Sequence, residues 1–381
     1  MGEARSKDAR LVVTGGGTGG HVYPAMAIAA EFRRRHMDAG ILYIGSRRGL
    51  ETRLVPQTGF DFASLSVGGI VGKSLPFKIY GLLGTVRAIA VAGRILRRFK
   101  PDVVVGTGGY VSVPVVMAAQ LMGIPTVLQE QNSVPGLANR LLSRRASLIF
   151  APSEDALEGL SRNIQAKAVV VGNPVRKDFS LVDRDIARRD YGIGDGEKLV
   201  VVTSGSGGAQ TINDAVSDWI DSMEPVPEGL HILFATGKKY HRSVTERITR
   251  VPPRVRVIEY LDDAPGAFTA ADLLICRAGA MTLAEATVVG APMIVVPSPN
   301  VAHDHQRANA RALEAAGAAV MVEDAECSGE AIGRIAGELI GSPRRLEQMS
   351  RASRGLGDPE ALDRMLGLIE ELMGVAGGDG D

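Results

Sequence analysis

Short apolar runs alternate with longer amphipathic segments along the first half of the chain. The runs consist almost entirely of Val, Ile and Leu, which is typical of strands buried on both faces of a parallel sheet. The expected strands are residues 11–13, 41–44, 103–105, 126–128, 148–150 and 169–171. Because helical stretches separate these strands, the pattern predicts a doubly wound α/β domain.

The same series restarts after Gly172-Asn173-Pro174, where an Asn-Pro step disfavours continuing structure. The second set of expected strands is residues 199–202, 232–234, 255–258, 273–276, 293–296 and 318–322. Residues 11–21 also align without gaps onto residues 200–210, each a strand, a Gly-rich turn and a helix start. We therefore expect two Rossmann-like domains, residues 1–173 and 174–357, with a last helix at about 358–373 that packs back on the first domain.

Length and composition agree with two folded domains. The chain has 381 residues and 45% hydrophobic residues, which suits a globular protein larger than one ordinary core. Its 46 glycines are well above the usual share and direct attention to Gly-rich loops. Two cysteines, Cys276 and Cys327, exclude a disulfide scaffold and a four-cysteine metal site.

The formal net charge of zero hides an asymmetry between the two halves. Residues 1–165 carry 20 Lys and Arg against 11 Asp and Glu, net +9, and the remaining residues carry 23 against 32, net −9. The first half should therefore prefer anionic partners. The apolar run after the charged start, residues 1–10, is too short for a signal segment or a membrane anchor.

A Gly-rich loop follows the first expected strand, with Gly15, Gly17 and Gly20 in the GxGxxG spacing. Backbone N–H groups and a helix dipole favour a phosphate there, although a tight turn that binds nothing has the same spacing. A dinucleotide site needs an acidic residue at the end of the second strand. That strand ends instead in residues 45–48, Gly-Ser-Arg-Arg, which could hold a 2′-phosphate. An NADP-dependent reductase is therefore an alternative.

Two observations weigh against the reductase. His21 follows the last glycine and places a group that titrates near neutral pH at the mouth of the loop. Two further Gly-rich loops occur after strands, at residues 106–110 in the first domain and 204–209 in the second. Three such loops indicate two separate phosphorylated ligands.

The second domain carries a polar segment, residues 277–285, that follows a strand and opens a helix. Glu285 lies about one turn into that helix, where its carboxylate could accept both hydroxyls of a ribose. The spacing Thr282-x-x-Glu285 fits a helix capping box equally well. Downstream, His303-Asp304-His305-Gln306 suits sugar hydroxyls, and a metal site is the alternative there, without other Cys or His nearby to complete it.

Taken together, these motifs resemble the MurG family of peptidoglycan N-acetylglucosaminyltransferases, over nearly the whole chain. The motifs are GGGTGGHVYPA (15–25), GTGGYVSVP (106–114), EQNSVPGLANR (130–140), GNPVR (172–176), SGSGGAQTIN (204–213), RAGAMTLAE (277–285) and HQRANA (305–310). The resemblance implies a GT-B fold, with UDP-N-acetylglucosamine bound by the C-terminal domain. It implies that the N-terminal domain receives an undecaprenyl-linked muramoyl-pentapeptide acceptor, and it implies no metal or other cofactor.

The resemblance also implies roles for single residues. Ser206 and Arg176 would contact the UDP diphosphate, the Leu261 backbone the uracil, Glu285 the ribose, and Asn132 and Gln306 the sugar, with Thr18, Gly19 and Gly20 also on the donor side. The acceptor would contact Gly15, Gly16, Gly17, His21, Gly108, Gly109 and Tyr110. The implied catalytic residues are His21, Glu130 and Asn132.

We expect an inverting transfer without a metal, because no pair of carboxylates follows a strand in a DxD-like pattern. His21 is the candidate base by its position, with Glu130 or Asp304 as alternatives, and a neutral His21 that binds an acceptor phosphate is equally compatible. Some positions depart from the family pattern: Ser204, Gly207, Ala264 and His305. Two competing interpretations of the whole chain are a UDP-N-acetylglucosamine 2-epimerase of the same architecture and a nucleotide-sensing protein without catalysis.

The segment 73–98 interleaves apolar and basic residues. It contains Leu75, Phe77, Ile79, Tyr80, Leu82 and Leu83 beside Lys73, Lys78 and Arg87. An ordinary buried helix explains this pattern, but the positive charge of this half favours contact with an anionic bilayer. We therefore expect peripheral binding at the cytoplasmic face of the cell membrane.

Overall fold

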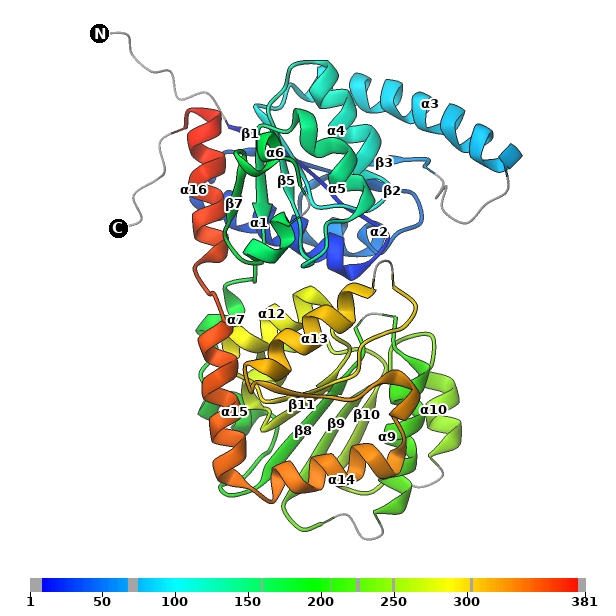
Figure 1. Ribbon diagram of the computed structural model, residues 1–381, viewed down its shortest axis with the longest axis vertical. Helices are drawn as coiled ribbons and strands as arrows, with labels where there is room; N and C mark the ends of the chain where they lie inside the picture. Colours follow the sequence, from blue (N-terminus) through cyan, green and yellow to red (C-terminus); the bar gives the residue numbers. More distant parts are fainter. Residues whose placement is uncertain are drawn as a thin grey trace. The chain divides into compact units, whose positions relative to one another are not determined.

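A computed structural model describes residues 9–67, 75–158, 160–205, 207–223, 227–248, 251–301 and 304–375, with the side chains of 75–83 left undescribed. The chain divides into two compact units, Met1–Pro174 with Glu360–Asp381, and Val175–Pro359. Each unit is a parallel sheet with helices on both faces, so the predicted α/β class is confirmed (Figure 1).

The sheet of the first unit has seven strands in the order β3-β2-β1-β4-β5-β6-β7. The strands are β1 (Arg10–Thr14), β2 (Gly40–Ser46), β3 (Asp61–Leu65), β4 (Val103–Gly106), β5 (Thr126–Gln129), β6 (Leu148–Ala151) and β7 (Ala168–Val170). The sequence pattern missed β3, because its residues, Asp-Phe-Ala-Ser-Leu, do not form a continuous apolar run. As an edge strand, β3 pairs with β2 alone and is only partly buried.

Two helical layers cover this sheet. The helices are α1 (Gly19–Arg35), α2 (Glu51–Leu54), α3 (Leu75–Phe99), α4 (Ser112–Leu121), α5 (Leu137–Leu142), α6 (Arg162–Gln165) and α16 (Ala361–Met373), with 3₁₀ turns at Val55–Thr58, Ser143–Arg145 and Glu154–Leu157. One core joins α1 and α16 to the sheet and the other joins α3 and α4 to it. Within the described part of the chain, no helix combines the length and apolarity needed to cross a bilayer.

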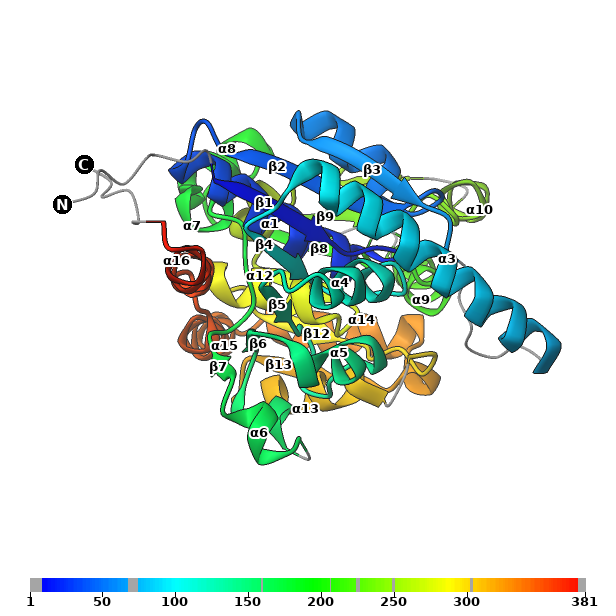
Figure 2. The ribbon, with the colours of Figure 1, turned by 90° about the horizontal axis from the view of Figure 1, so that it is seen from above.

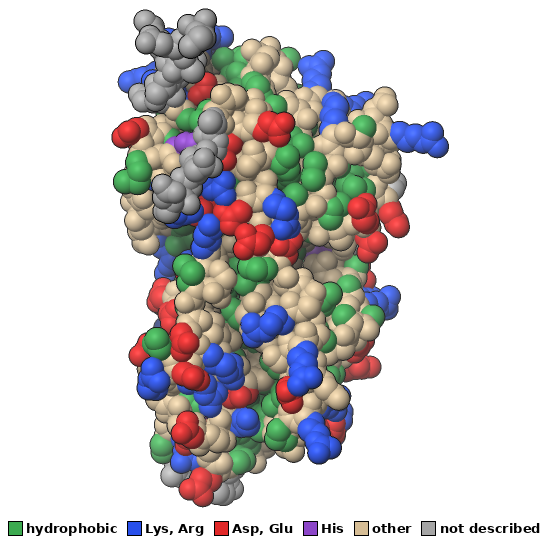
Figure 3. Space-filling view, turned by 90° about the vertical axis from the view of Figure 1, so that its left-hand side faces the viewer, with side chains coloured by type: hydrophobic (Ala, Val, Ile, Leu, Met, Phe, Trp, Pro, Cys, Tyr) green, Lys and Arg blue, Asp and Glu red, His purple; other side chains and the backbone are tan. Residues whose placement is uncertain are grey.

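The helix α16 follows the second unit in the sequence but packs on the first, beside α1 (Figure 1). It buries Leu362, Leu366 and Ile369. Arg35 forms ion pairs with Asp363 and, at 3.2 Å, with Glu370. Figure 3 shows acidic and basic side chains interspersed on this face of the first unit. Apolar burial and ion pairs thus both hold α16 in place.

The second unit has six parallel strands in the order β10-β9-β8-β11-β12-β13. The strands are β8 (Lys198–Thr203), β9 (Leu230–Ala235), β10 (Val255–Ile258), β11 (Leu273–Cys276), β12 (Met293–Val295) and β13 (Ala319–Met321). The helices are α7 (Asp178–Leu181), α8 (Arg184–Asp190), α9 (Gln210–Ser222), α10 (His241–Arg247), α11 (Ala264–Ala270), α12 (Ala280–Val289), α13 (His305–Ala315), α14 (Gly329–Ile340) and α15 (Pro343–Leu356), with a 3₁₀ turn at Asp324–Glu326.

In both sheets the strand order reverses beside the first strand of the unit, as β2-β1-β4 and as β9-β8-β11. Loops that leave the carboxyl ends of neighbouring strands on the two sides of such a reversal diverge, and ligands bind in the crevice between them. The topology therefore places the loops after β1 and β4 at the reversal of the first sheet, and the loops after β8 and β11 at the reversal of the second.

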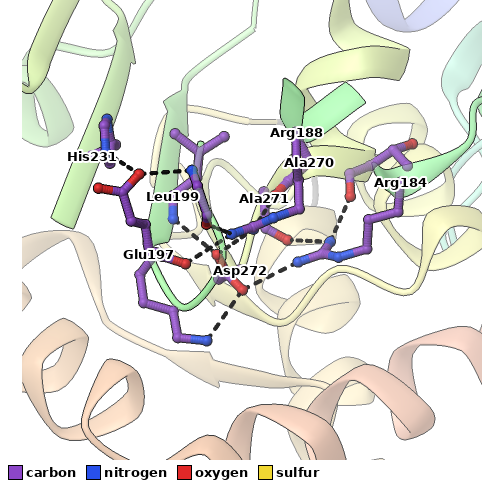
Figure 4. A network of polar contacts seen from close by, with 11 residues as sticks. Arg184, Arg188, Glu197, Leu199, His231, Ala270, Ala271 and Asp272 are labelled. Carbon is purple, nitrogen blue, oxygen red and sulfur yellow. Dashed lines mark hydrogen bonds and ion pairs between the residues drawn. The ribbon is translucent and has the colours of Figure 1, made fainter. Parts of the chain in front are cut away.

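A polar network closes the opposite, amino-terminal end of the second sheet (Figure 4). Asp272, directly before β11, accepts hydrogen bonds at 2.9 Å from the Leu199 N–H and from Arg188. It also pairs with Arg184 at 3.1 Å. The two arginines in turn donate to carbonyls at the end of α11 and before β8, including those of Ala271 and Glu197. One carboxylate therefore fixes β8, α8 and β11 to one another.

We predict that Asp272→Asn destabilises the second unit. The substitution keeps the shape but removes the charge that faces two arginines, which should cost about 2–3 kcal/mol and lower the melting temperature by about 5–10 °C. Thermal denaturation checks this. Asp218→Asn is the matched control, because its ion pair with Arg247 is exposed and should be worth less than about 0.5 kcal/mol. Equal losses in the two variants would contradict the role given to Asp272.

Candidate functional site

Two Gly-rich loops of the first unit, those after β1 and β4, pack closely against each other through backbone atoms. A Cβ atom on Gly15 would lie 2.5 Å from the His21 carbonyl oxygen and would overlap the Thr107 side chain. A Cβ atom on Gly109 would overlap the Gly16 carbonyl, and Gly109 has a φ of +80°. Only glycine fits at these positions, so the loops after β1 and β4 form one continuous backbone surface.

Two buried residues that the sequence analysis missed, Glu51 and Tyr43, hold the first loop in place by hydrogen bonds. The Glu51 carboxylate accepts hydrogen bonds from the Ser46 N–H at 2.8 Å, the Ser46 hydroxyl at 2.6 Å and the Gly17 N–H at 3.4 Å. The Tyr43 hydroxyl donates to the Gly15 carbonyl at 2.8 Å. Burial, and then the nearby Glu51, raise the pKa of Tyr43 well above its ordinary value. Both donors of Ser46 are therefore engaged by Glu51, while Arg47 and Arg48 of the same segment are exposed.

Other predicted residues lie around this surface. Thr18 occupies the N-cap of α1 without a side-chain hydrogen bond, so α1 opens with Gly19 and Gly20 at an uncapped end. An uncapped helix start offers free N–H groups and a positive dipole end to an anion. The half-exposed Tyr110 ring packs against Gly17, where a Cβ atom would lie 3.2 Å from the ring.

His21, in the first turn of α1, lies where the two loops meet. Its Nδ1 is 3.0 Å from the Thr107 carbonyl oxygen and 3.1 Å from Gln131 Oε1. The Thr107 hydroxyl donates to the His21 carbonyl at 2.7 Å. A Cβ atom on Gly108 would lie 2.8 Å from Nδ1, so this glycine leaves room for the ring. Among the described residues, none forms a hydrogen bond with Nε2 of His21.

Glu130 organises the loop that carries Asn132. Its Oε1 accepts from the N–H of Gln131 at 3.1 Å and of Asn132 at 3.0 Å, and from the Asn132 side chain at 3.2 Å. Its Oε2 accepts at 2.9 Å from the Gly136 N–H and from the Asn139 side chain. A carboxylate has about four lone-pair sites. With five donors around it, this buried carboxylate has no free site for a substrate proton.

The second unit repeats the interlocked arrangement around the loop between β8 and α9. A Cβ atom on Gly208, which has a φ of +72°, would overlap the Thr236 carbonyl oxygen. Asn213 in α9, another residue missed as a candidate, donates to the same oxygen at 2.9 Å. Ser206 lies outside the described residues. The neighbouring Ser204 Oγ is buried and makes no hydrogen bond within the part of the chain that is described.

Glu285 does not take part in a helix cap. The N-cap of α12 is Gly279, so Thr282 lies inside the helix and the capping-box alternative is wrong. Burial of the Glu285 carboxyl raises its pKa to about 7, with Arg176 lowering it and Asp178 raising it. Arg176 also pairs with Asp178 at 3.3 Å. Glu285 and Arg176 are therefore electrostatically coupled within this unit.

The remaining candidates of the second unit are distributed over two loops. Leu261 follows β10, and its backbone makes no hydrogen bond to the rest of the described chain. Gln306 Oε1 accepts from the Ser298 N–H at 2.9 Å. Asp304, at the N-cap of α13, pairs with Arg307 at 3.0 Å. His303 lies outside the described residues, and the residues that are described contain no cluster of three metal-ligating side chains.

Comparisons with known proteins agree with this arrangement. The glycosyltransferase family 28 N-terminal domain matches residues 11–151, and the family 28 C-terminal domain matches residues 199–365. The UDP-N-acetylglucosamine--N-acetylmuramyl-(pentapeptide) pyrophosphoryl-undecaprenol N-acetylglucosamine transferase of Desulforudis audaxviator is 40% identical over 371 residues, which is 96% of this chain and 99% of that protein.

Solved structures show the same fold. MurG of Acinetobacter baumannii superimposes with a TM-score of 0.72 at 27% identity, covering 95% of this chain and 99% of that one. The UDP-GlcNAc 2-epimerase of Neisseria meningitidis has a TM-score of 0.66 at 18% identity, covering 95% and 100%, and shares the fold alone. The GT-B class with two Rossmann-like units is thus confirmed. By full-length sequence identity, the chain belongs to the MurG family of N-acetylglucosamine transferases, within glycosyltransferase family 28.

Proposed function

We propose that the protein transfers N-acetylglucosamine from UDP-N-acetylglucosamine to the 4-hydroxyl of a lipid-linked N-acetylmuramoyl-pentapeptide, with inversion at the anomeric carbon. The observation that carries this proposal is the 40% identity, over 96% of the chain, to an enzyme named for this transfer. The reaction belongs to peptidoglycan synthesis, and therefore to cell wall formation and cell division.

The competing functions fit the observations less well. The epimerase structure resembles this chain at only 18% identity, so it supports a shared fold and not a shared reaction. The reductase required a phosphate site at the end of β2, where Glu51 occupies both donors of Ser46. A carboxylate at that place would also repel a 2′-phosphate.

The proposal assigns the donor to the second unit. Arg176, Ser206 and the Gly-rich loop before α9 would hold the diphosphate, and the unpaired Leu261 backbone would hold the uracil. Glu285 would accept the ribose hydroxyls, with Gln306 near the sugar. When UDP leaves, negative charge grows on the diphosphate. Loop N–H groups, the α9 dipole and Arg176 can stabilise that charge.

The acceptor belongs to the first unit in this proposal, with its diphosphate on the backbone surface of residues 15–17 and 108–109. The acceptor 4-oxygen forms a bond to the anomeric carbon, and the bond from that carbon to the UDP oxygen breaks with its electron pair leaving on UDP. His21 takes the proton of the hydroxyl. Glu130 is saturated by donors and Asp304 is paired with Arg307, which leaves His21 as the base that fits best.

Peripheral membrane binding is the second part of the proposal. Leu121 and Met122 at the end of α4, and Leu137 and Leu141 on α5, are exposed. The Gln120 side chain donates to the Leu142 carbonyl at 3.0 Å and so joins the ends of α4 and α5, and Figure 2 shows α4 between α3 and α5. The basic residues Arg140, Arg144 and Arg145 are exposed around them.

We call Leu121, Met122, Leu137 and Leu141, with these three arginines, the α4–α5 patch. An apolar surface with a basic fringe suits an anionic bilayer. The side chains first expected to bind lipid, those of Lys73, Leu75, Phe77, Lys78, Ile79, Tyr80, Leu82 and Leu83, lie outside the described set. Arg87 of the same helix is exposed.

The first prediction from this proposal tests the reaction. Purified protein should release UDP from UDP-N-acetylglucosamine only when a muramoyl-pentapeptide diphospholipid is present, and the product should carry a β-linked N-acetylglucosamine. Chromatography and NMR of the product measure both. An epimerase would instead convert the donor into its 2-epimer without an acceptor, and a sensing protein would bind the donor without releasing UDP.

The second prediction concerns Glu285→Gln. In the free protein the Glu285 pKa is about 7, and ribose hydroxyls that donate to the carboxylate favour its charged form. UDP affinity should therefore rise about ten-fold from pH 6 to pH 8. Calorimetry of the variant should show a UDP affinity that does not change between pH 6 and pH 8. At pH 8 this affinity should be ten- to hundred-fold lower than that of the parent, which is roughly the contribution of hydrogen bonds to a charged acceptor.

The stability of this variant should change in the opposite sense. The folded pKa of Glu285 lies above its ordinary value of 4.5, so ionisation reduces stability as the pH rises from about 4.5 to above 7. Without ligand, Glu285→Gln should be more stable than the parent at pH 8, by about 1–2 kcal/mol for a partly exposed group. The exposed Glu246→Gln is the control. Lost stability with unchanged UDP affinity would assign Glu285 a structural role.

The third prediction concerns the α4–α5 patch. The parent should sediment with anionic vesicles and less so at high salt, since each basic residue near the surface adds about 1 kcal/mol. A Leu137→Glu, Leu141→Glu variant should lose this binding while its UDP affinity is unchanged. Leu181→Glu in the second unit is the matched control, because that leucine is 78% exposed against 71% for Leu137. Equal binding to neutral vesicles would count against the patch.

A further inference from the structure

The hydrogen bonds around the His21 ring define which nitrogen carries the proton. Nδ1 lies 3.0 Å from the Thr107 carbonyl oxygen and 3.1 Å from Gln131 Oε1. A backbone carbonyl can only accept a hydrogen bond, so Nδ1 must be the donor. In the neutral ring, Nε2 then carries the lone pair.

The orientation of the Gln131 amide is itself fixed. Its Nε2 donates to the Thr107 carbonyl at 2.7 Å and to the Gln129 carbonyl at 3.1 Å, and both of these groups can only accept. The amide oxygen is therefore the atom that faces His21. Gln131 is buried, so the amide cannot turn toward water instead.

Two more side-chain amides hold Gln131 in place. Gln129 donates to the Glu130 carbonyl at 2.9 Å and to Asn173 Oδ1 at 3.2 Å, which leaves Gln129 Oε1 to accept from the Gln131 side chain. Asn173 completes the ring of contacts by donating to the Gln131 carbonyl at 3.1 Å. The two N–H groups of the Gln131 amide thus face three acceptors, the Thr107 and Gln129 carbonyls and Gln129 Oε1, and reversing this amide would place its oxygen against all three.

The groups in hydrogen-bond contact with the imidazole, within the described residues, are neutral. Of the carboxylates on neighbouring segments, Glu51 accepts from Ser46 and the Gly17 N–H, and Glu130 is saturated by its own loop. Tyr110, in the loop after β4, packs on Gly17. A neutral amide oxygen at Nδ1 orients the ring without the strong preference for the imidazolium that a carboxylate would impose.

We propose that Gln131 is a positioning residue that, together with the Thr107 carbonyl, fixes His21 as the Nδ1–H tautomer with the Nε2 lone pair free. Its catalytic consequence rests on the proposed function, in which Nε2 accepts the proton of the acceptor hydroxyl. Gln131 touches neither substrate in this scheme and acts only through His21.

The first test reads the tautomer without any reaction. Two-bond ¹H–¹⁵N correlation NMR of the full-length protein above the titration of His21, with His21→Ala to assign the signals, should show a pyrrole-type Nδ1 and a pyridine-type Nε2. Gln131→Met, which has the same length without polar atoms, leaves Nδ1 with the Thr107 carbonyl as its acceptor and should lower the share of the Nδ1–H tautomer. An Nε2–H tautomer in the parent would overturn the proposal.

The second test measures turnover against pH with a water-soluble short-chain acceptor. Gln131→Met should lower kcat at least ten-fold and by no more than the 10²–10⁴-fold that general base catalysis contributes, with UDP affinity unchanged. Gln131→Glu should move the acidic limb of the profile upward by about one pH unit or more, since a carboxylate beside Nδ1 stabilises the imidazolium. Gln165→Glu, an exposed glutamine whose amide also donates to carbonyls, is the control for an added carboxylate.

The outcomes distinguish the positioning of His21 by Gln131 from the role of His21 as the base. If NMR shows the Nδ1–H tautomer but neither Gln131 variant changes the pH profile, His21 is positioned as described and is not the base, so the base assignment fails. A uniform loss of activity at all pH values in Gln131→Glu, with its limb unmoved, would mean a merely structural role for Gln131. Melting temperatures and UDP affinity show whether each variant remains folded.

Discussion

The close approach of two glycine backbones is the constraint on which the first unit depends. The loops after β1 and β4 can touch only because Gly15, Gly16 and Gly109 have no side chains, and Gly109 and Gly17 adopt positive φ values. This contact brings the start of α1, with His21, against Thr107. The second unit contains the same kind of close backbone contact, in which Gly208 lies against the Thr236 carbonyl. A backbone surface formed in this way offers N–H groups to phosphates and leaves specificity to the few side chains at its rim.

Buried polar groups make these surfaces rigid. Glu51, Glu130 and Gln131 lie under the loops of the first unit, and each makes hydrogen bonds that compensate its loss of hydration. Such networks are stable only when complete, which explains why a glutamine can define the tautomer of a histidine. His21 and the loops that flank it are therefore oriented before any substrate arrives, and in the proposed reaction this reduces the reorganisation that proton transfer requires.

Glu285 contributes to stability differently from Glu51 and Glu130. Its partly exposed carboxyl has a pKa raised to about 7 by burial, so the free protein holds the ionised group at a cost in stability. A ligand that donates hydroxyls to the carboxylate would relieve that cost. The proposed binding role of Glu285 therefore opposes stability, whereas the carboxylates of Glu51 and Glu130 are compensated by hydrogen bonds within the protein.

Features that depend on local pattern could be predicted from the amino-acid sequence. Continuous apolar runs marked six strands in each half, the glycine spacing marked the loops, and the motifs identified the family. The strand β3 could not be predicted, because its mixed composition becomes a strand only where β2 offers it a free edge. The sequence also could not decide whether Thr282 caps a helix, because that depends on the residue at which α12 begins. The roles of Glu51, Glu130 and Gln131 required the tertiary structure, because hydrogen bonding joins groups far apart in the chain: His21 and Gln131 are 110 residues apart, and no local spacing reports such a pair.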